Sequence, residues 1–132
     1  LCPSDPGDRL RLDAGAPYHY PLTYGFNGGT WHVFDNTTKA GSDGAFYPNS
    51  RTSPRDFTDG MSNTLCFAEV KAYTHYTRDQ SDGTATPPSS LAALGGGDPS
   101  GRTSGHTEWV DGRVHQTGFT TVFGPNSITP VG

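Results

Sequence analysis

Carboxylate, amide and hydroxyl side chains that gather in turn-rich segments are the groups in this sequence best suited to binding a cation. One segment places four of them within eight residues, namely Asp56, Asp59, Ser62 and Asn63. Ca²⁺ prefers oxygen ligands of these kinds, so this segment is the first candidate calcium site. Plain turn chemistry is the alternative, because Asp and Asn side chains also bond their own backbone in turns.

Two further loops carry similar groups and are rival calcium sites. The first contains Asp35 and Asp43, and the second contains Asp79 and Asp82. Neither follows the ligand spacing of an EF-hand loop. The sequence therefore leaves open which loop would hold Ca²⁺, and turn chemistry competes with metal binding at each of them.

Histidines and carboxylates near the C-terminal end could support a different chemistry. On a strand, His106 and Glu108 would share a face, and a turn at Asp111 could bring His115 opposite them. Two histidines and a carboxylate can hold Zn²⁺ or perform acid–base catalysis. Pairing of polar side chains across two strands on a solvated face is the favoured interpretation, because the order lacks the spacing of known zinc hydrolases.

No other pattern points to catalysis. A G-x-S-x-G nucleophile elbow is absent, and Cys66 lies in an apolar run, where a thiol is normally inert. Cys2 and Cys66 are predicted to form one disulfide, with two buried thiols as the alternative. Asn36 begins an Asn-Thr-Thr acceptor pattern for N-glycosylation. We expect no catalytic residue and no enzymatic activity.

The composition indicates one β-rich domain with a thin core. Of 132 residues, 18 are Gly and 11 are Pro, hydrophobic residues make up only 31%, and aromatic residues make up 11%. Such a mixture favours turns and short strands over long helices, and the aromatic content argues against disorder. A net charge of -4 gives no footprint for nucleic acid, and no apolar run is long enough to insert into a membrane.

Alternation of apolar and polar residues predicts several short strands. The best hairpin signal is the pair of runs 106–110 and 113–117 on either side of Asp111-Gly112. Residues 90–94 predict one helical turn with a Ser cap. The other expected strands are 18–20, 22–24, 31–34, 45–47, 64–77 and 118–123. The expected fold is mainly β, a single antiparallel domain over 1–132 with long Gly/Pro-rich loops, at most one or two short helical turns, and extended termini at 1–17 and 124–132.

Three stretches and one glutamate together resemble a prepilin-type, pilin-like bacterial family of unknown function (domain of unknown function 1559). The stretches are LCPSD at 1–5, RDFTDGMSNT at 55–64, which Glu69 follows, and GHTEWVDGRV at 105–114. Members of that family typically start with a prepilin leader and a long hydrophobic helix, which would lie upstream of Leu1. The spacing from His106 to Asp111-Gly112 is shorter here than is usual in the family. The resemblance implies an exported, pseudopilin-like β head.

These observations together predict a non-enzymatic structural subunit of an extracellular filament, tube or surface layer. The chain would self-associate through β surfaces and termini into a homopolymer at the cell surface, with Ca²⁺ stabilising its loops. The alternative is a monomeric adhesion module that binds glycans or other surface proteins, and a metal-dependent hydrolase is the least favoured interpretation. An aromatic set would supply the thin core or the binding surface: Tyr18, Tyr20, Tyr24, Phe26, Trp31, Phe34, Phe46 and Tyr47.

Overall fold

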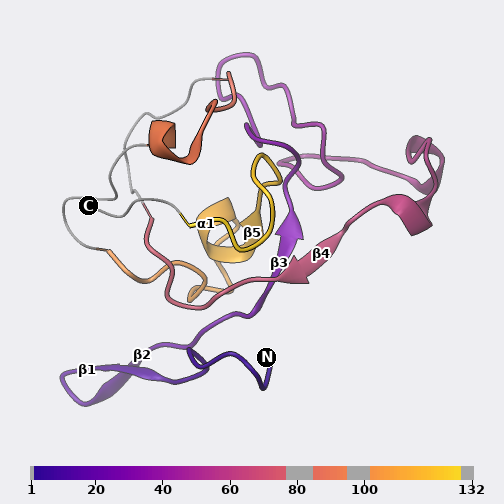
Figure 1. Ribbon diagram of the computed structural model, residues 1–132. Helices are drawn as coiled ribbons and strands as arrows, with labels where there is room; N and C mark the ends of the chain where they lie inside the picture. The colour runs from indigo at the N-terminus through magenta and orange to yellow at the C-terminus, as the bar shows by residue number, and fades with distance from the viewer. Residues whose placement is uncertain (1, 77–84, 95–101, 129–132) are drawn as a thin grey trace.

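The computed structural model describes residues 2–76, 85–94 and 102–128, and most of its regular structure consists of short strands in two small sheets (Figure 1). The strands are β1 (Arg11–Asp13), β2 (Ala16–His19), β3 (Tyr24–Asn27), β4 (Phe67–Glu69) and β5 (Gly118–Phe119). One α-helical turn, α1 (Val114–Thr117), precedes β5, and three 3-10 turns complete the elements: η1 (Pro54–Asp56), η2 (Met61–Asn63) and η3 (Leu91–Leu94). The predicted mainly β class is confirmed, but β5 pairs parallel rather than antiparallel with β3, and the described residues form four helical turns where at most one or two were expected.

Strand β3 is the centre of the larger sheet, whose order is β4-β3-β5. It pairs antiparallel with β4, with Phe26 opposite Phe67, and parallel with β5, with Phe26 beside Gly118. Glycine at 25 and 118 permits this close approach, because a Cβ on Gly25 would lie 3.3 Å from the Gly118 Cα atom. The sheet thus joins three segments that are far apart in the sequence.

Strands β1 and β2 form a separate antiparallel hairpin that projects from the rest of the molecule (Figure 1). Its two-residue turn, Ala14-Gly15, has positive φ at both positions, 48° and 82°, as the favoured hairpin turns require. Each of the two strands makes its main contacts with the other, and no other described helix or strand supports the hairpin to a comparable extent. Most of this hairpin lies within residues 1–17, which the sequence predicted to be an extended terminus.

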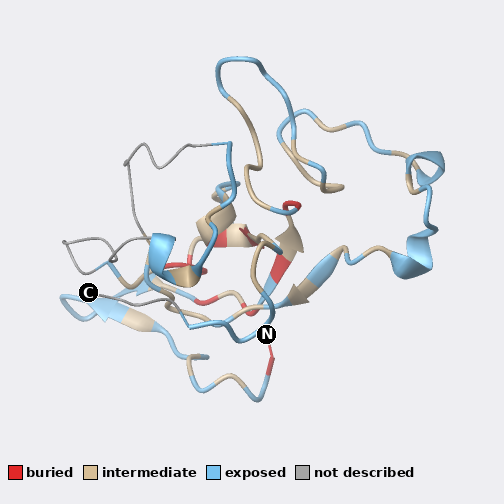
Figure 2. Ribbon diagram, turned by 45° about the horizontal axis from the view of Figure 1, so that its top comes forward, coloured by how far each residue is buried: buried red, intermediate tan, exposed pale blue. Residues whose placement is uncertain are grey.

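The interior of the described structure is polar rather than apolar. Cys2 is the one buried hydrophobic residue in the described ranges, whereas Thr23, His106, Thr107 and Gln116 are all buried (Figure 2). Gln116 is 0% exposed. Hydrogen bonds therefore take over much of the role that apolar packing has in an ordinary domain.

The Gln116 carboxamide is the central member of this polar interior. Its Oε1 accepts hydrogen bonds from the backbone amides of Thr107, at 2.9 Å, and Glu108, at 3.1 Å. Thr107 in turn donates its hydroxyl to the Ser104 carbonyl at 2.6 Å. These bonds fasten the loop 104–108 to α1, since buried amides must find an acceptor.

The hairpin predicted across Asp111-Gly112 is wrong. The Asp111 carboxylate accepts a bond from the Arg113 backbone amide at 3.0 Å, and the Thr117 hydroxyl donates to the Asp111 carbonyl at 2.9 Å. These local bonds wind 114–117 into α1 instead of a returning strand.

Other predicted strands are shorter than expected or absent. The strand at 64–77 is reduced to β4, and Tyr73, with a φ of 58°, interrupts extended chain before Thr74 forms a single bridge with Gly105. In the run 31–34, Phe34 alone forms a bridge, with Gly41, and 45–47 form no strand. The helical turn at 90–94 is confirmed as η3, with Ser90 Oγ accepting from the Ala93 amide at 3.3 Å.

Replacing Gln116 by Met tests the role of this carboxamide. Gln116→Met keeps a long unbranched side chain but leaves two backbone amides without their acceptor, so we expect the free energy of unfolding to fall by about 2–4 kcal/mol. Urea unfolding measures the change. Ser127→Ala, which removes an exposed hydrogen bond to the Gly124 carbonyl, is the control and should cost less than about 0.5 kcal/mol. Equal stability of Gln116→Met and wild type would contradict this role.

Candidate functional site

One polar cleft brings together two of the loops that the sequence proposed as separate calcium sites. Asp43 lines this cleft beside Asp56, Asp59 and Asn63. The volume of the cleft is about 580 Å³. Ser62, in η2, does not line it. Three carboxylates from residues 43–59 therefore share one opening.

The carboxylates of the cleft already serve as acceptors within their own loops. Asp56 Oδ2 accepts from both the amide and the hydroxyl of Ser53 at 2.7 Å, and the Ser53 hydroxyl, followed by its amide, lowers the pKa of Asp56. Asp43 accepts from the hydroxyl and the amide of Thr30, and these two bonds, the hydroxyl first, lower its pKa. Asp59 has a weaker bond of 3.4 Å from the Thr64 hydroxyl. Turn chemistry thus accounts for Asp43 and Asp56, and Asp59 is the least committed carboxylate.

The remaining predicted cation ligands lie elsewhere. Asp35 accepts bonds from the amides of Thr37, at 2.7 Å, and Thr38, at 3.1 Å, and the Thr38 amide is the main cause of its lowered pKa. Asp79 and Asp82 lie outside the described residues. In the described ranges no three His, Cys, Asp or Glu side chains are grouped so that they could hold a metal ion. Calcium binding stays a prediction.

His106 is buried and ties three segments together. Its Nε2 lies 3.0 Å from the Gly118 carbonyl oxygen in β5, and its Nδ1 lies 3.1 Å from the Lys71 carbonyl oxygen and 3.2 Å from the Thr74 hydroxyl. Both ring nitrogens are therefore occupied by groups of the protein itself. This environment suits a structural histidine and leaves no free nitrogen for a metal ion.

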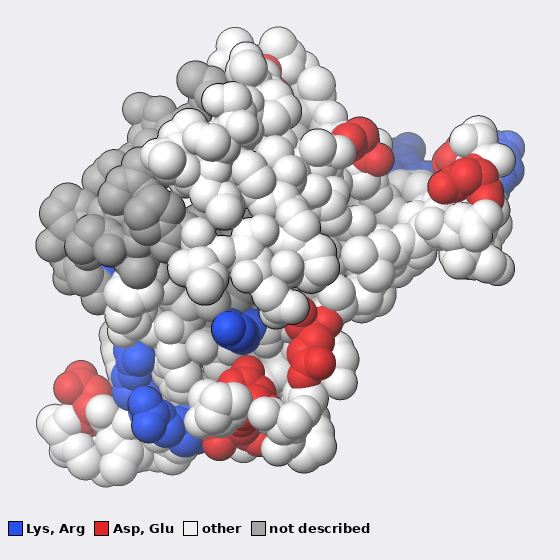
Figure 3. Space-filling view, in the orientation of Figure 1, with Lys and Arg blue, Asp and Glu red and all other residues white. Residues whose placement is uncertain are grey.

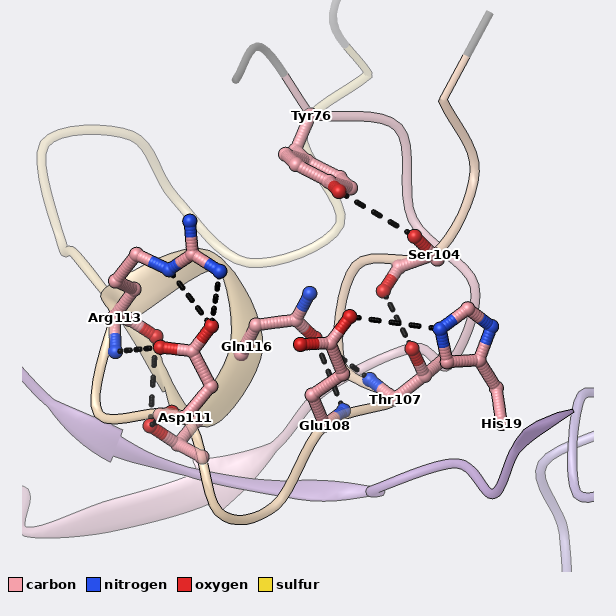
Figure 4. Close-up of polar contacts among 9 residues, drawn as sticks. His19, Tyr76, Ser104, Thr107, Glu108, Asp111, Arg113 and Gln116 are labelled. Carbon is pink, nitrogen blue, oxygen red and sulfur yellow. Dashed lines mark hydrogen bonds and ion pairs between the residues drawn. The ribbon is translucent and has the colours of Figure 1, made fainter. Parts of the chain in front are cut away.

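The other members of the predicted zinc group have separate partners, and Figure 4 shows Glu108 facing His19 and Asp111 facing Arg113. Glu108 lies 3.5 Å from Nε2 of His19, and Asp111 is paired with Arg113. His115 stacks on the Tyr76 ring, with centroids 4.3 Å apart and an interplanar angle of 13°. The described residues do not form the two-histidine, one-carboxylate site, because the hairpin that would have aligned these residues is replaced by α1.

The environment of His115 lowers its pKa and so favours the neutral ring. Burial lowers its pKa, and the positive charge of Arg113 lowers it further, whereas Asp111 and Glu108 act in the opposite direction and His106 adds to the lowering. Its Nε2 is buried and has no hydrogen-bond partner among the described residues. A proton added at this nitrogen would therefore be poorly solvated.

The predicted covalent sites lie apart from these clusters. Cys2 and Cys66 are both free thiols, so the predicted disulfide is absent from this structure. The Cys2 thiol is buried and lies 2.9 Å from the Ser4 hydroxyl, while the Cys2 amide donates to Thr23 Oγ1 at 2.6 Å. Asn36 is exposed in a turn, where it is accessible, and its glycosylation stays a prediction.

Three phenylalanine rings form one cluster, in which Phe26 and Phe46 are half-buried and Phe67 is 60% exposed. Phe46 lies between Phe26, at 6.0 Å, and Phe67, at 5.2 Å, measured between ring centroids. Several of the predicted set line an apolar cavity of about 720 Å³: Phe26, Phe34, Phe46 and Tyr47, together with Val33 and Val114. Tyr18, Tyr20 and Tyr24 are at least half exposed, so they do not serve as core residues.

Tyr18 and Tyr20, which the sequence indicated as part of the core or of a binding surface, contribute to an exposed surface beside the hairpin, and Trp109 is the member of this surface that the sequence did not indicate. Trp109 is 72% exposed and lies with Tyr18 and Tyr20 along one groove of about 310 Å³. On the face seen in Figure 3 the charged side chains gather at two ends, where Figure 1 places the β1–β2 hairpin and the turns η1 and η2, and a broad uncharged area lies between these ends. Exposed aromatic side chains of this size are typical of binding surfaces.

A family model described as a protein of unknown function (DUF1559) matches residues 1–132. No curated protein and no solved structure matches the chain. In the described ranges, no helix has the length and apolar character needed to cross a membrane.

The state of His115 predicts how stability depends on pH. The unfolded chain binds a proton at His115 near the ordinary pKa of 6.5, whereas the folded chain resists it, so stability should fall as the pH drops below that value. His115→Phe preserves a ring against Tyr76 but does not titrate, and we expect its melting temperature to decline less than that of wild type on mild acidification. His75→Phe, at an exposed position, is the control. Identical declines in all three proteins would show that His115 carries none of the effect.

Proposed function

The chain belongs to the DUF1559 family over its whole length, and from this premise we propose that it is a non-enzymatic structural subunit of an extracellular filament, tube or surface layer. The family is of prepilin type, which implies secretion. Self-association of many copies is the function that the exposed apolar surface supports best.

The observation that carries this proposal is the distribution of apolar side chains. Cys2 is the one buried hydrophobic residue in the described ranges, yet eleven large hydrophobic residues are between 43% and 84% exposed. They are Leu10, Leu12, Tyr18, Tyr20, Tyr24, Met61, Leu65, Phe67, Trp109, Val110 and Ile128. Each exposed square ångström of apolar surface costs about 25 cal/mol relative to burial, so contacts between copies would be favourable.

Free strand edges offer a second route to association. Strand β4 is at the edge of its sheet, and the β1–β2 hairpin has no further strand on either side among the described residues. An unpaired edge is a template for a strand from another chain. A contact between two different surfaces of identical copies propagates into an open polymer unless the rotation closes a ring.

The histidine geometry supports a structural rather than a catalytic role. Both nitrogens of His106 face oxygen atoms of the protein, and His115 is stacked and buried at Nε2. A general base must reach the proton that it abstracts, so neither ring is placed for that task. The metal-dependent hydrolase therefore has less support than either non-enzymatic function.

A monomeric adhesion module is the second candidate. The groove lined by Tyr18, Tyr20 and Trp109 favours it, since aromatic faces can stack on sugars or on a partner protein. Binding of the purified chain to a glycan array would favour this function over assembly if the binding depends on Trp109 and the chain stays monomeric.

The assembly proposal predicts concentration-dependent polymers. Purified chain, examined by sedimentation and electron microscopy at increasing concentration, should pass from monomers to regular filaments or tubes above a critical concentration. The apolar surfaces drive this step, so cooling should weaken it, because hydrophobic association weakens at low temperature. Monomers at every concentration and temperature would contradict the proposal.

Calcium binding at Asp59, the freest carboxylate of the cleft, is proposed as a stabilising addition. Because no three carboxylates of the described residues are grouped to hold a metal ion, amide, hydroxyl and carbonyl oxygens would supply the remaining ligands. If Ca²⁺ binds only the folded chain, a concentration of about 100 times Kd adds about 2.7 kcal/mol of stability. We expect thermal unfolding to shift upward in Ca²⁺ relative to EDTA, and Asp59→Asn to remove most of the shift. Asp13→Asn, in the exposed hairpin, should retain it. No shift in wild type would exclude a stabilising calcium site.

A further inference from the structure

Two exposed apolar surfaces lie at opposite ends of the molecule. The first, the hairpin surface, consists of Leu10, Tyr18, Tyr20, Trp109 and Val110, which line one groove between the β1–β2 hairpin and the loop at 107–110. The second, the apolar strip, consists of Met61, Leu65 and Phe67 and runs from η2 into β4. In both Figure 1 and Figure 2 the hairpin lies at one end of the ribbon and η2 at the other, and the chain from η2 leads inward to β4 beside β3.

The hairpin surface is large enough to form most of an interface. Tyr18, Tyr20 and Trp109 are 62%, 50% and 72% exposed, and Val110 is 76% exposed. With aromatic side chains of roughly 150–250 Å² each, the five side chains expose about 600 Å², against about 800 Å² per partner in a standard protein interface. Tyr and Trp are also the residues that most often dominate binding energy.

A few side-chain contacts hold the hairpin to the rest of the described chain. Arg11 in β1 donates to the Thr103 carbonyl at 3.1 Å and lies 4.4 Å from the centre of the Tyr73 ring, and Nε2 of His19 in β2 lies 3.5 Å from Glu108. An isolated two-stranded hairpin is at best marginally stable in water and needs a third strand or another packing surface. The contacts of Arg11 and His19 leave the tyrosines of this face exposed. A neighbouring molecule that covers them would complete the hairpin.

The polar groups of the groove favour a protein over a sugar as its occupant. Sugar hydroxyls need hydrogen-bonding side chains beside the aromatic rings, but Glu108 is paired with His19 and the Thr107 hydroxyl donates to the Ser104 carbonyl. The aliphatic Leu10 and Val110 add apolar area that a sugar would use poorly. The surface matches the apolar centre of an interface between proteins.

The apolar strip is a surface on which the hairpin surface of another copy could dock. Met61 and Phe67 are each 60% exposed and Leu65 is 51% exposed. They lead into the outer edge of β4, which is unpaired in the described part of the sheet. Side-chain contact and strand pairing can therefore act together at this edge.

We propose that the hairpin surface of one copy docks on the apolar strip of a second copy of this chain. This inference rests on the proposed assembly function and names the two surfaces that perform it. Because the surfaces differ and lie at opposite ends, each copy can engage two neighbours at once. The contact is heterologous and extends the polymer in one direction.

The test uses one charged substitution in each surface of the full chain. Trp109→Asp and Leu65→Asp change exposed side chains, and each should raise the critical concentration for polymerisation at least tenfold. Tyr18→Asp is a second hairpin variant, so the result does not depend on one substitution. Ile128→Asp, at a residue that is 84% exposed outside both surfaces, is the control and should polymerise like wild type. Circular dichroism verifies that all four variants fold.

Mixing the variants tests the pairing of the two surfaces directly. A Trp109→Asp copy retains its strip and a Leu65→Asp copy retains its hairpin surface, so an equimolar mixture should form dimers and stop there. Sedimentation velocity would show this dimer, which neither variant forms alone. A mixture that stays monomeric, or one that polymerises, would overturn the proposed pairing.

The outcomes separate this inference from the function on which it rests. Polymers formed equally well by wild type, Trp109→Asp and Leu65→Asp would overturn the two surfaces and leave the assembly function standing. A wild type that never polymerises would remove the assembly function itself. Glycan binding by a monomeric wild type, lost in Trp109→Asp, would assign the hairpin surface to adhesion and also overturn the inference.

Discussion

The carboxamide of Gln116 is the interaction on which the rest of this structure depends. It is completely buried, and its oxygen holds the backbone amides of Thr107 and Glu108. By fixing the loop 104–108 against α1, it places His106, whose ring then links Lys71 and Thr74 to β5. Strand β5 completes the sheet around β3. A chain with few apolar residues can reach a defined fold in this way because buried hydrogen bonds of fixed geometry favour one arrangement, although Nε2 of Gln116 itself is buried without a partner among the described residues.

A polar interior has a direct consequence for the surface. Apolar side chains that find no place inside stay in water, and here they gather beside the hairpin and along the segment that leads into β4. A net contribution of about 1 kcal/mol per hydrogen bond gives a small chain limited stability. Burial between copies would add stability that a single copy lacks. If copies assemble as proposed, folding and assembly would be two parts of one physical problem for this chain, and membership of a prepilin-type family, which implies secretion, fits that proposal.

The sequence predicted the general character of the fold but few of its elements. High Gly and Pro content and short alternating runs correctly indicated strands, turns and little helix. The prediction of a hairpin at Asp111-Gly112 was wrong because the two flanking runs are also compatible with other structures. The side-chain hydrogen bonds of Asp111 and Thr117 stabilise a helical turn there instead. Asp43 and Asp56 were recognised as polar loop residues, but their shared cleft depends on contacts distant in sequence. The sequence did not indicate Gln116 or His19, because neither belongs to a motif. Their roles depend on contacts made in the fold, those of Gln116 with Thr107 and Glu108 and that of His19 with Glu108.

Hydrogen exchange, measured residue by residue in dilute and in concentrated samples, tests most directly whether neighbouring copies cover the surfaces that a single copy leaves exposed. The account predicts that the amides of Thr107 and Glu108, bonded to Gln116, are protected in both samples. It also predicts that hairpin residues 11–19 exchange rapidly in the dilute monomer and become protected on assembly. Equal protection of the hairpin in both samples, or rapid exchange at Thr107 and Glu108 in the monomer, would contradict it.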